Sequence, residues 1–365
     1  MKKLKLVLKR FKIISTSKRV KNLFFGLVDA PVLKDIYMAL YRRQIKKAIS
    51  SSCLVLNVEP YNMCNLKCVM CPYPKMTREK ELMTMELYTR IIKEAAELGC
   101  DRIAYSVYNE PLLDPHLFER IKLAKEHGMR TNMASNATLL NKENAVKILD
   151  SGLDYVNFSV DSFDKETYDK IRVGGKHEKT VENIVNFYKE REKLGLKKPF
   201  ISISIVQMKM NAEGLDKTME FFKKYSDVIS LAGLDNRKDL YGTDDSFVED
   251  NDLFGDVKRT KLPNPCFDPT NLIITSDGKV VLCCRDYDGK IVLGDLKKQS
   301  ISDVLLSEKF KGFFRLHLNR KGDMISLCKN CSKLYGGTAF GWWLKKTNEK
   351  KQSEKLKEIL TEITK

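Results

Sequence analysis

The feature that most constrains this chain is a group of three cysteines within eight residues, spaced Cys-x3-Cys-x2-Cys at Cys64, Cys68 and Cys71. Three thiolates on one short loop can bind three irons of a cubane [4Fe–4S] cluster and leave the fourth iron without a protein ligand. A cluster that only carries electrons normally has four cysteine ligands, so an open iron points to a bound substrate or cofactor. The alternatives are a zinc knuckle or buried structural thiols, although zinc ligands usually come as two separated pairs.

Composition places the chain among ordinary soluble proteins. Of its 365 residues 43% are hydrophobic and 31% charged, which suits one large domain plus a small one. It lacks a run of eighteen apolar residues, so no transmembrane helix is expected. Ten cysteines without a signal peptide indicate a reducing, cytoplasmic location and thiolate ligands in place of disulfides. The four histidines follow no metal-binding pattern.

The positive charge is concentrated in residues 1–50, which carry fourteen Lys or Arg residues against two acidic residues. Apolar residues at helical spacing alternate there with basic ones, which predicts a basic amphipathic N-terminal extension. It is interpreted either as peripheral contact with an anionic membrane surface or as a helix packed on the core with a solvated basic face. The remainder of the chain is nearly balanced in charge, so nucleic-acid binding is not expected.

From residue 54 onwards, six short apolar segments alternate with helical patterns. This alternation predicts a parallel sheet with right-handed crossovers. We therefore expect an α/β fold, a partial (β/α)6 TIM-like barrel. A small C-terminal β-hairpin/helix iron–sulfur domain is added to this expectation only by the family resemblance of a second cysteine set, given below. Catalytic sites of such barrels lie at the carboxyl ends of the strands, and the cysteine loop directly follows the first strand. The expected strands are 54–59, 102–107, 130–134, 155–160, 200–206 and 228–232.

Three polar motifs follow the next three strands. They read Tyr-Asn-Glu-Pro-Leu, then Ser-Asn-Ala-Thr-Leu-Leu, then Ser-Val-Asp-Ser followed by Tyr-x-x-Ile-Arg. In this order and with the cysteine loop, they resemble the radical S-adenosylmethionine (radical SAM) superfamily over about residues 54–232. The chain departs from the family pattern where Tyr108 and Asn109 replace two glycines and Ser162 replaces another. Asn tolerates left-handed backbone better than most residues, so the first of these turns is expected to survive.

The resemblance implies that Cys64, Cys68 and Cys71 bind a [4Fe–4S] cluster whose open iron chelates S-adenosyl-L-methionine. One electron then cleaves this cofactor to methionine and a 5′-deoxyadenosyl radical, which abstracts a hydrogen atom from the substrate. It also implies five residues that contact S-adenosylmethionine: Asn109, Glu110, Asn136, Ser159 and Arg172. The sequence identifies no catalytic residue beyond these.

A second set of cysteines consists of Cys266, Cys283, Cys328 and Cys331. A predicted hairpin, 271–283 with an Asp-Gly turn, carries the second of them. Because neighbouring residues on a strand point to opposite faces, only one of Cys283 and Cys284 is expected to be a ligand. The spacing resembles a truncated SPASM domain, of the "twitch" type, which implies a second, fully ligated [4Fe–4S] cluster. A zinc ribbon with four cysteine ligands remains the alternative.

The predicted organisation has five parts. A linker or lid at 234–265 separates the core from the second cysteine set, within which a helix is expected over 301–316, and the Lys/Glu-rich tail is expected to be a solvated helix. The parts are the N-terminal extension (1–50), the radical SAM core (51–233), the linker or lid (234–265), the SPASM/twitch domain (266–344) and a charged C-terminal helix (345–365).

Two functions are compatible with this organisation. The first is an oxidoreductase acting on a small molecule or carbohydrate, in which the auxiliary cluster takes the second electron. The alternative is a peptide- or protein-modifying maturase, although residues 1–50 show no alternating strand pattern for a leader-binding domain. Either function requires a reducing partner such as a flavodoxin or ferredoxin.

Overall fold

The computed structural model describes residues 39, 43, 52–233, 269–319, 321–329, 331 and 353–364. The N-terminal extension, apart from residues 39 and 43, the linker or lid at 234–265 and Cys266 lie outside the described residues.

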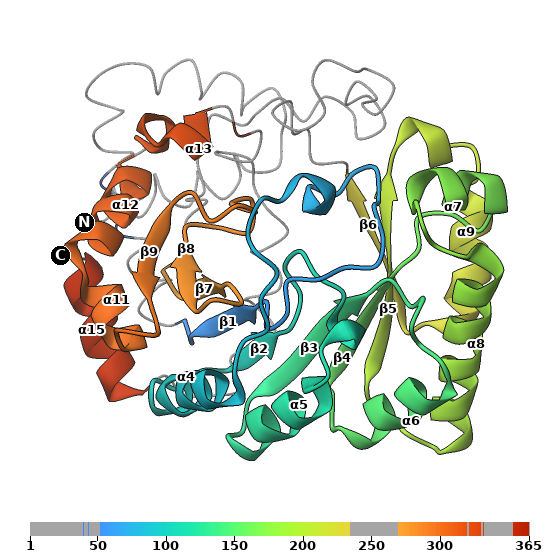
Figure 1. The fold of residues 1–365 in the computed structure, drawn as a ribbon, viewed down its shortest axis with the longest axis horizontal. Coiled ribbons are helices and arrows are strands. Elements are labelled where there is room, and N and C mark those ends of the chain that lie inside the picture. The colour runs from blue at the N-terminus through green and yellow to red at the C-terminus, as the bar shows by residue number, and fades with distance from the viewer. Residues whose placement is uncertain are drawn as a thin grey trace, which may run out of the picture.

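Among the described residues, nine strands form one open sheet in the order β6-β5-β4-β3-β2-β1-β7-β8-β9 (Figure 1). The seven strands from β6 to β7 in this order pair in parallel with one another, whereas β8 is antiparallel to both β7 and β9. The six core strands predicted from the sequence are all present. The strands are β1 (Val55–Val58), β2 (Arg102–Ala104), β3 (Arg130–Ser135), β4 (Tyr155–Ser159), β5 (Phe200–Gln207), β6 (Val228–Gly233), β7 (Asn271–Ile274), β8 (Lys279–Val281) and β9 (Val292–Asp295).

The helices of the core alternate with its strands, as the sequence predicts. Several begin at a side chain that accepts a backbone N–H of the first turn: Thr84 accepts from Leu87 at 3.2 Å and Asn141 from Asn144 at 2.8 Å. Gly99, with a φ of 72°, adopts the left-handed conformation directly after the first helix. The core helices are α4 (Met85–Glu97), α5 (Leu117–Glu126), α6 (Lys142–Asp150), α7 (Lys165–Ile171), α8 (His177–Lys193) and α9 (Leu215–Phe222).

The two faces of the parallel sheet differ in polarity. Apolar side chains such as Met133, Val156 and Phe158 are buried in the main hydrophobic cluster. Between them along the same strands, Asn132 and Asn157 are half-buried. Because side chains alternate across a strand, the sheet has one apolar face and one polar face.

The second cysteine region does not form a separate sheet. Strand β7 pairs in parallel with β1, so that Val55 lies opposite Asn271 and Val58 opposite Ile274. The Glu59 N–H donates to the Ile274 carbonyl at 2.9 Å. The predicted hairpin with its Asp-Gly turn is confirmed, since β8 pairs antiparallel with β7. The second cysteine region is therefore attached to the core through the first core strand.

The single helix predicted over 301–316 is wrong. The structure has α11 (Ile301–Leu306) and α12 (Glu308–Leu318). The two are separated at Ser307, whose extended backbone (ψ 144°) ends one helix while its hydroxyl accepts the Phe310 N–H at 3.2 Å. Strand β9 was also not anticipated; it packs so closely on α11 that a Cβ at Gly294 would lie 2.3 Å from Val304 Cγ2.

The composition of the C-terminal segment predicted a solvated helix. The helix α15 (Glu354–Thr364) is instead buried along one side. Apolar residues at the i, i+3, i+4, i+7 spacing of a helical stripe join the main hydrophobic cluster. They are Leu356, Ile359, Leu360 and Ile363. The Lys/Glu-rich composition concealed this stripe. In Figure 1, α15 lies beside α11, at the end of the sheet occupied by β7, β8 and β9.

Candidate iron–sulfur and cofactor site

The first cysteine loop leaves β1 and lies beside the turn between α7 and α8. The Lys67 N–H donates to the Val173 carbonyl at 2.9 Å, and the Val69 N–H donates to the Ile171 carbonyl at 3.0 Å. Within the loop, the Cys71 N–H donates to the Cys68 carbonyl at 3.0 Å. These main-chain bonds fix the loop at the carboxyl edge of the sheet.

Each of the three sulfur atoms in this loop faces a nitrogen donor. Asn136 Nδ2 lies 4.0 Å from Cys64 Sγ, and Arg172 Nη1 lies 3.6 Å from Cys68 Sγ. The backbone N–H of Tyr73 lies 3.5 Å from Cys71 Sγ. Donors directed at sulfur are what iron-bound thiolates accept, and they adjust the properties of a cluster. The loop therefore fits a cubane cluster held by three cysteines.

Burial and, to a smaller extent, the neighbouring Glu110 carboxylate together raise the pKa of the Cys64 thiol to about 12. Burial opposes any charged group that lacks a compensating charge. A thiolate at this position thus requires positive charge beside it, which a bound iron would provide.

Glu110, at the end of the segment that follows β2, is almost completely buried. Its carboxylate accepts from the Ser135 hydroxyl at 2.8 Å, from the Asn136 N–H at 2.7 Å and from the Leu112 N–H at 3.1 Å. Burial raises the pKa of Glu110, and these hydrogen bonds offset part of the shift. Its side chain therefore joins the ends of β2 and β3 and orients Asn136 towards Cys64.

Asn109 does not adopt the left-handed backbone that its place in the motif suggested. Its side chain closes the turn instead, accepting from the Val107 N–H at 3.0 Å and donating to the Tyr105 carbonyl at 3.1 Å. The left-handed residues other than glycine in the described segments are Ala137 (φ 59°) and Asp161 (φ 71°).

Arg172 contacts the loop at Cys68, whereas Ser159 lies at the end of β4. Arg172 forms an ion pair with buried Asp161 at 2.7 Å, and Asp161 also accepts from the Val206 N–H at 2.7 Å. The hydroxyl of Ser159 lies 3.2 Å from that of Ser204 on β5. The structure thus brings Glu110, Asn136 and Arg172 to the cysteine loop, whereas the Ser159 side chain is directed along the sheet.

The second cysteine set has a comparable pattern of donors. The Arg285 N–H lies 3.4 Å from Cys283 Sγ, and Arg285 Nη1 lies 2.6 Å from Cys331 Sγ. Cys328, on the short helix α13 (Ser326–Lys329), lies 3.9 Å from His317 Nε2. Burial lowers the pKa of His317 to about 4, so its ring is neutral at pH 7. The described cysteines of this set therefore fit a cluster as well.

Cys283 and Cys284 lie beyond the end of β8, which stops at Val281. The prediction that the strand reaches residue 283 was two residues too long. The alternation of side chains along a strand therefore does not decide between the two cysteines. Cys283 is half-buried and Cys284 is exposed.

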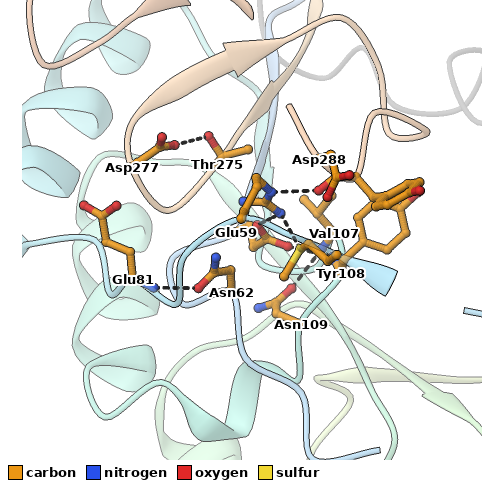
Figure 2. Close-up of polar contacts among 12 residues, drawn as sticks. Glu59, Asn62, Glu81, Val107, Tyr108, Asn109, Thr275, Asp277 and Asp288 are labelled. Atoms are coloured by element: carbon orange, nitrogen blue, oxygen red, sulfur yellow. Dashed lines mark hydrogen bonds and ion pairs between the residues drawn. The ribbon is translucent and has the colours of Figure 1, made fainter. Parts of the chain in front are cut away.

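A polar network connects the two cysteine regions (Figure 2). Buried Glu59 pairs with Arg78 at 2.6 Å and accepts from the Tyr108 N–H at 3.0 Å. Arg78 Nε donates to the Tyr287 carbonyl at 2.7 Å, and the Tyr108 hydroxyl donates to the Cys284 carbonyl. The rings of Tyr108 and Tyr287 meet edge to face at 6.2 Å. Tyr108 therefore spans from the strand-end motif of the core to the turn that carries Cys283.

Sequence reasoning did not identify Glu59, Arg78, Arg285 or His317 as parts of these sites. The sequence held two signals of these contacts. The first is that Tyr108 stands where the family has glycine, because a bulky side chain there needs a packing or hydrogen-bonding partner. Arg285, directly after two cysteines, was a second signal. Neither could show which sulfur or carbonyl the side chain contacts.

A cavity of about 440 Å³ opens beside this network, between the segment 62–81 and the turns of the hairpin. Its charged walls pair with each other, as Lys279 does with Asp277 at 2.6 Å and Lys297 with Glu81 at 3.0 Å. Within the described segments, no three His, Cys, Asp or Glu side chains are grouped so as to hold a single metal ion. A cubane requires a different arrangement, because each thiolate binds its own iron. No described helix is long and apolar enough to cross a membrane.

Two family models match the chain. That of the radical SAM superfamily covers residues 58–222, and that of an iron–sulfur cluster-binding (SPASM) domain covers residues 266–332. The first predicted cysteine set lies in the former and the second in the latter.

Individual proteins match over most of the chain. A tungsten-containing aldehyde ferredoxin oxidoreductase cofactor-modifying protein of Pyrococcus furiosus is 25% identical over 76% of this chain and 86% of its own length. The S-adenosyl-L-methionine-dependent 2-deoxy-scyllo-inosamine dehydrogenase of Niallia circulans is 23% identical over 77% and 93%. The crystal structure of Streptococcus suis SuiB bound to the precursor peptide SuiA has a TM-score of 0.59 at 17% identity, over 86% of this chain and 78% of that one.

The fold of SuiB agrees with the α/β architecture and its parallel sheet described above. Radical SAM domains bind a [4Fe–4S] cluster and S-adenosylmethionine, and SPASM domains bind additional iron–sulfur clusters. With both family models matched in the order in which the two cysteine sites occur, this chain belongs to the radical SAM superfamily and carries a C-terminal SPASM domain.

Proposed function

We propose that this chain is a radical SAM oxidoreductase that oxidises a small molecule or carbohydrate by two electrons, using its second cluster as electron acceptor. The observation that carries the proposal is the network through Tyr108, which joins the cofactor motif after β2 to the turn of the second cysteine set. A substrate radical formed at the first site needs an oxidant at short range, and this contact between the two segments supports such an arrangement.

The ligand sets follow from the two cysteine groups. Cys64, Cys68 and Cys71 hold the first cluster, and Cys283, Cys328 and Cys331 hold the second together with Cys266. When bound, the first cluster supplies one electron that cleaves S-adenosylmethionine to methionine and a radical, which takes a hydrogen atom from the substrate and becomes 5′-deoxyadenosine. A cluster held by the second cysteine set would accept the electron that the substrate loses next, and a proton would leave to solvent. The substrate therefore loses two electrons and two protons.

The chain's own residues position these groups. Asn136 and Arg172 donate towards the thiolates of Cys64 and Cys68, and Glu110 holds Asn136 in place through its backbone N–H. With Asn109 and Ser159, these residues form the proposed S-adenosylmethionine site at the polar edge of the sheet. Asn109 contributes by closing the turn that presents Glu110.

The relatives support a small substrate. The Pyrococcus furiosus relative is named for modifying a cofactor and the Niallia circulans relative for dehydrogenating 2-deoxy-scyllo-inosamine, and each aligns over more than three quarters of this chain. A hydroxyl-bearing carbon next to an amine or a second hydroxyl is thus the first substrate class to examine. Modification of a peptide is the alternative outcome of the same experiment.

The experiment is anaerobic incubation of reconstituted protein with S-adenosylmethionine and dithionite, scored by 5′-deoxyadenosine release and by substrate mass. Aminocyclitols and sugars are compared with cysteine- or serine-containing peptides. The proposal expects a product two mass units lighter than its aminocyclitol or sugar substrate. Turnover of peptides alone would replace it with the maturase function.

Two further parts of the proposal concern partners in the cytoplasm. A flavodoxin or ferredoxin supplies the first electron, and replacing dithionite by either reduced protein is expected to sustain 5′-deoxyadenosine formation.

Residues 1–50 contact anionic membranes peripherally through their excess of basic residues. Equal sedimentation of the chain with neutral and anionic vesicles, or none, would remove the membrane contact.

A further inference from the structure

The second cysteine site has a cationic side chain in direct contact with its thiols. Arg285 directly follows the two adjacent cysteines, and its guanidinium Nη1 lies 2.6 Å from Cys331 Sγ. Its own backbone N–H lies 3.4 Å from Cys283 Sγ. One residue therefore contacts sulfur atoms that are separated by 48 positions in the sequence.

The first site also has an arginine at a thiol, and that arginine is paired with a carboxylate. Arg172 approaches Cys68 at 3.6 Å while its guanidinium pairs with the buried carboxylate of Asp161 at 2.7 Å. The buried Glu110 carboxylate adds negative charge beside Cys64. The surroundings of the first site thus combine one arginine with two carboxylates.

We infer that Arg285 sets the reduction potential of the second cluster and makes it an electron acceptor. Reduction adds one negative charge to a cluster, and a guanidinium at its thiolate stabilises the reduced state more than the oxidised state. A guanidinium keeps its charge at any pH at which proteins are handled. Its effect is therefore a constant upward shift of the potential.

The inference rests on the proposed function, because it concerns the cluster that takes the second electron. After hydrogen abstraction, the substrate radical transfers its electron to the second cluster. A higher reduction potential of that cluster shifts the equilibrium of this transfer towards the oxidised product. Arg285 would act through Cys331 and Cys283, so it is a positioning residue that supplies charge to the cluster ligands.

The test is an EPR-monitored redox titration of the full-length holoprotein, with iron and zinc measured first. Three variants are compared with the wild type: Arg285→Gln, Arg285→Lys and, as a matched control, Arg315→Gln. Arg315 lies on α12 in the same region, is exposed and pairs with Glu308 at 2.8 Å. Repeating the titration with Cys64, Cys68 and Cys71 changed to Ala removes the overlapping signal of the first cluster.

We expect Arg285→Gln to reduce the ratio of reduced to oxidised second cluster at a fixed potential by at least tenfold, or about 59 mV for one electron. Arg285→Lys keeps the charge and is expected to retain most of the wild-type potential, and Arg315→Gln all of it. If Arg285→Gln loses the cluster, Arg285→Met is the second uncharged variant.

If the reduction potential of the second cluster is the same in Arg285→Gln as in the wild type, the inference is overturned. It is also overturned if Arg285→Lys lowers that potential as much as Arg285→Gln does. Loss of the second cluster from both uncharged variants, with its retention in the Lys variant, also overturns it and makes Arg285 a structural residue. Zinc in the wild-type second site would instead contradict the proposed function itself, since an electron acceptor requires a redox-active metal.

Discussion

The two cysteine sites differ in how they are assembled and in the charge around them. The first comes from one loop of eight residues at the carboxyl edge of a parallel sheet, with its donors supplied by the neighbouring strand ends. The second draws on a hairpin turn and on α13, positions far apart in the sequence. The first has carboxylates beside its arginine, whereas the second has an arginine directly at sulfur.

This difference indicates a division of work between the sites. A cluster that must reduce S-adenosylmethionine needs a low reduction potential. Buried carboxylates nearby lower that potential, because they destabilise the additional negative charge of the reduced cluster. A cluster that accepts an electron benefits from a cation. The pairing of β1 with β7 joins the strand that precedes the first cysteine loop to the hairpin that precedes Cys283.

The largest effect is expected from removing the first site. Changing Cys64, Cys68 and Cys71 to Ala should remove roughly half of the iron, because each cluster has its own ligands, and should abolish S-adenosylmethionine cleavage. Iron analysis and 5′-deoxyadenosine assays measure the two outcomes. Formation of 5′-deoxyadenosine by the triple variant would refute the assignment of this site.

Removing the second site should have a different result. A Cys328→Ala, Cys331→Ala variant is expected to retain cleavage of S-adenosylmethionine but to lose the oxidised product, since the first loop does not depend on these thiols. The ratio of product to 5′-deoxyadenosine is the measurement. Normal product formation by the double variant would mean that the second site has no part in electron transfer.

The same comparison explains what could be predicted from the sequence. The first cysteine set lies within one contiguous motif, so the sequence could predict that it follows the first strand, and the alternating pattern of the core predicted the six parallel strands. Strand β9, the break at Ser307 and the pairing of β7 with β1 depend on contacts between distant segments. Periodicity within one segment does not record such contacts.

Side-chain roles were harder to predict than positions. Glu110 matched the family motif, but its burial and its three hydrogen bonds depend on residues after β3. Arg172 was expected at the cofactor, and its pairing with Asp161 and Cys68 appears only once the turn after α7 lies against the cysteine loop. The tail was misjudged because its composition outweighed its four-residue apolar stripe.

A smaller effect concerns the connection between the sites. Arg78→Met leaves the buried Glu59 carboxylate without its counter-charge, which should lower the free energy of unfolding by about 3–5 kcal/mol at neutral pH. Urea unfolding measures the loss. Lys147→Met is a matched control, because its pair with Glu143 at 2.6 Å is exposed and screened by solvent, so its loss should leave the free energy of unfolding nearly unchanged.

The pH dependence identifies the group responsible. Burial raises the pKa of Glu59 above its ordinary value of 4.5, and Arg78 lowers it, so removing Arg78 raises it further. The folded state then binds a proton more tightly than the unfolded state, and stability falls as the pH rises above 4.5. The stability difference between wild type and Arg78→Met should therefore narrow as the pH is lowered from 7 towards 4.5. If the stability difference between wild type and Arg78→Met does not change with pH, the unpaired Glu59 carboxylate is not its cause. The same conclusion follows if adding Glu59→Gln to Arg78→Met does not reduce the loss of stability.

The smallest effect is expected at Cys284, beside a residue whose loss should be severe. The exposed side chain of Cys284 is not assigned as a ligand; its backbone carbonyl accepts the Tyr108 hydroxyl, and alanine keeps that carbonyl. Cys284→Ala should thus retain its iron, its second-cluster potential and its stability within about 0.5 kcal/mol. Cys283→Ala should lose the second cluster, since that sulfur faces the Arg285 N–H. The iron content and the EPR spectra of the two variants, prepared in parallel, show which cysteine is the ligand. Loss of the cluster from Cys284→Ala and its retention in Cys283→Ala would make Cys284 the ligand in place of Cys283. The hydroxyl of Tyr108 would then contact the backbone of a cluster ligand directly.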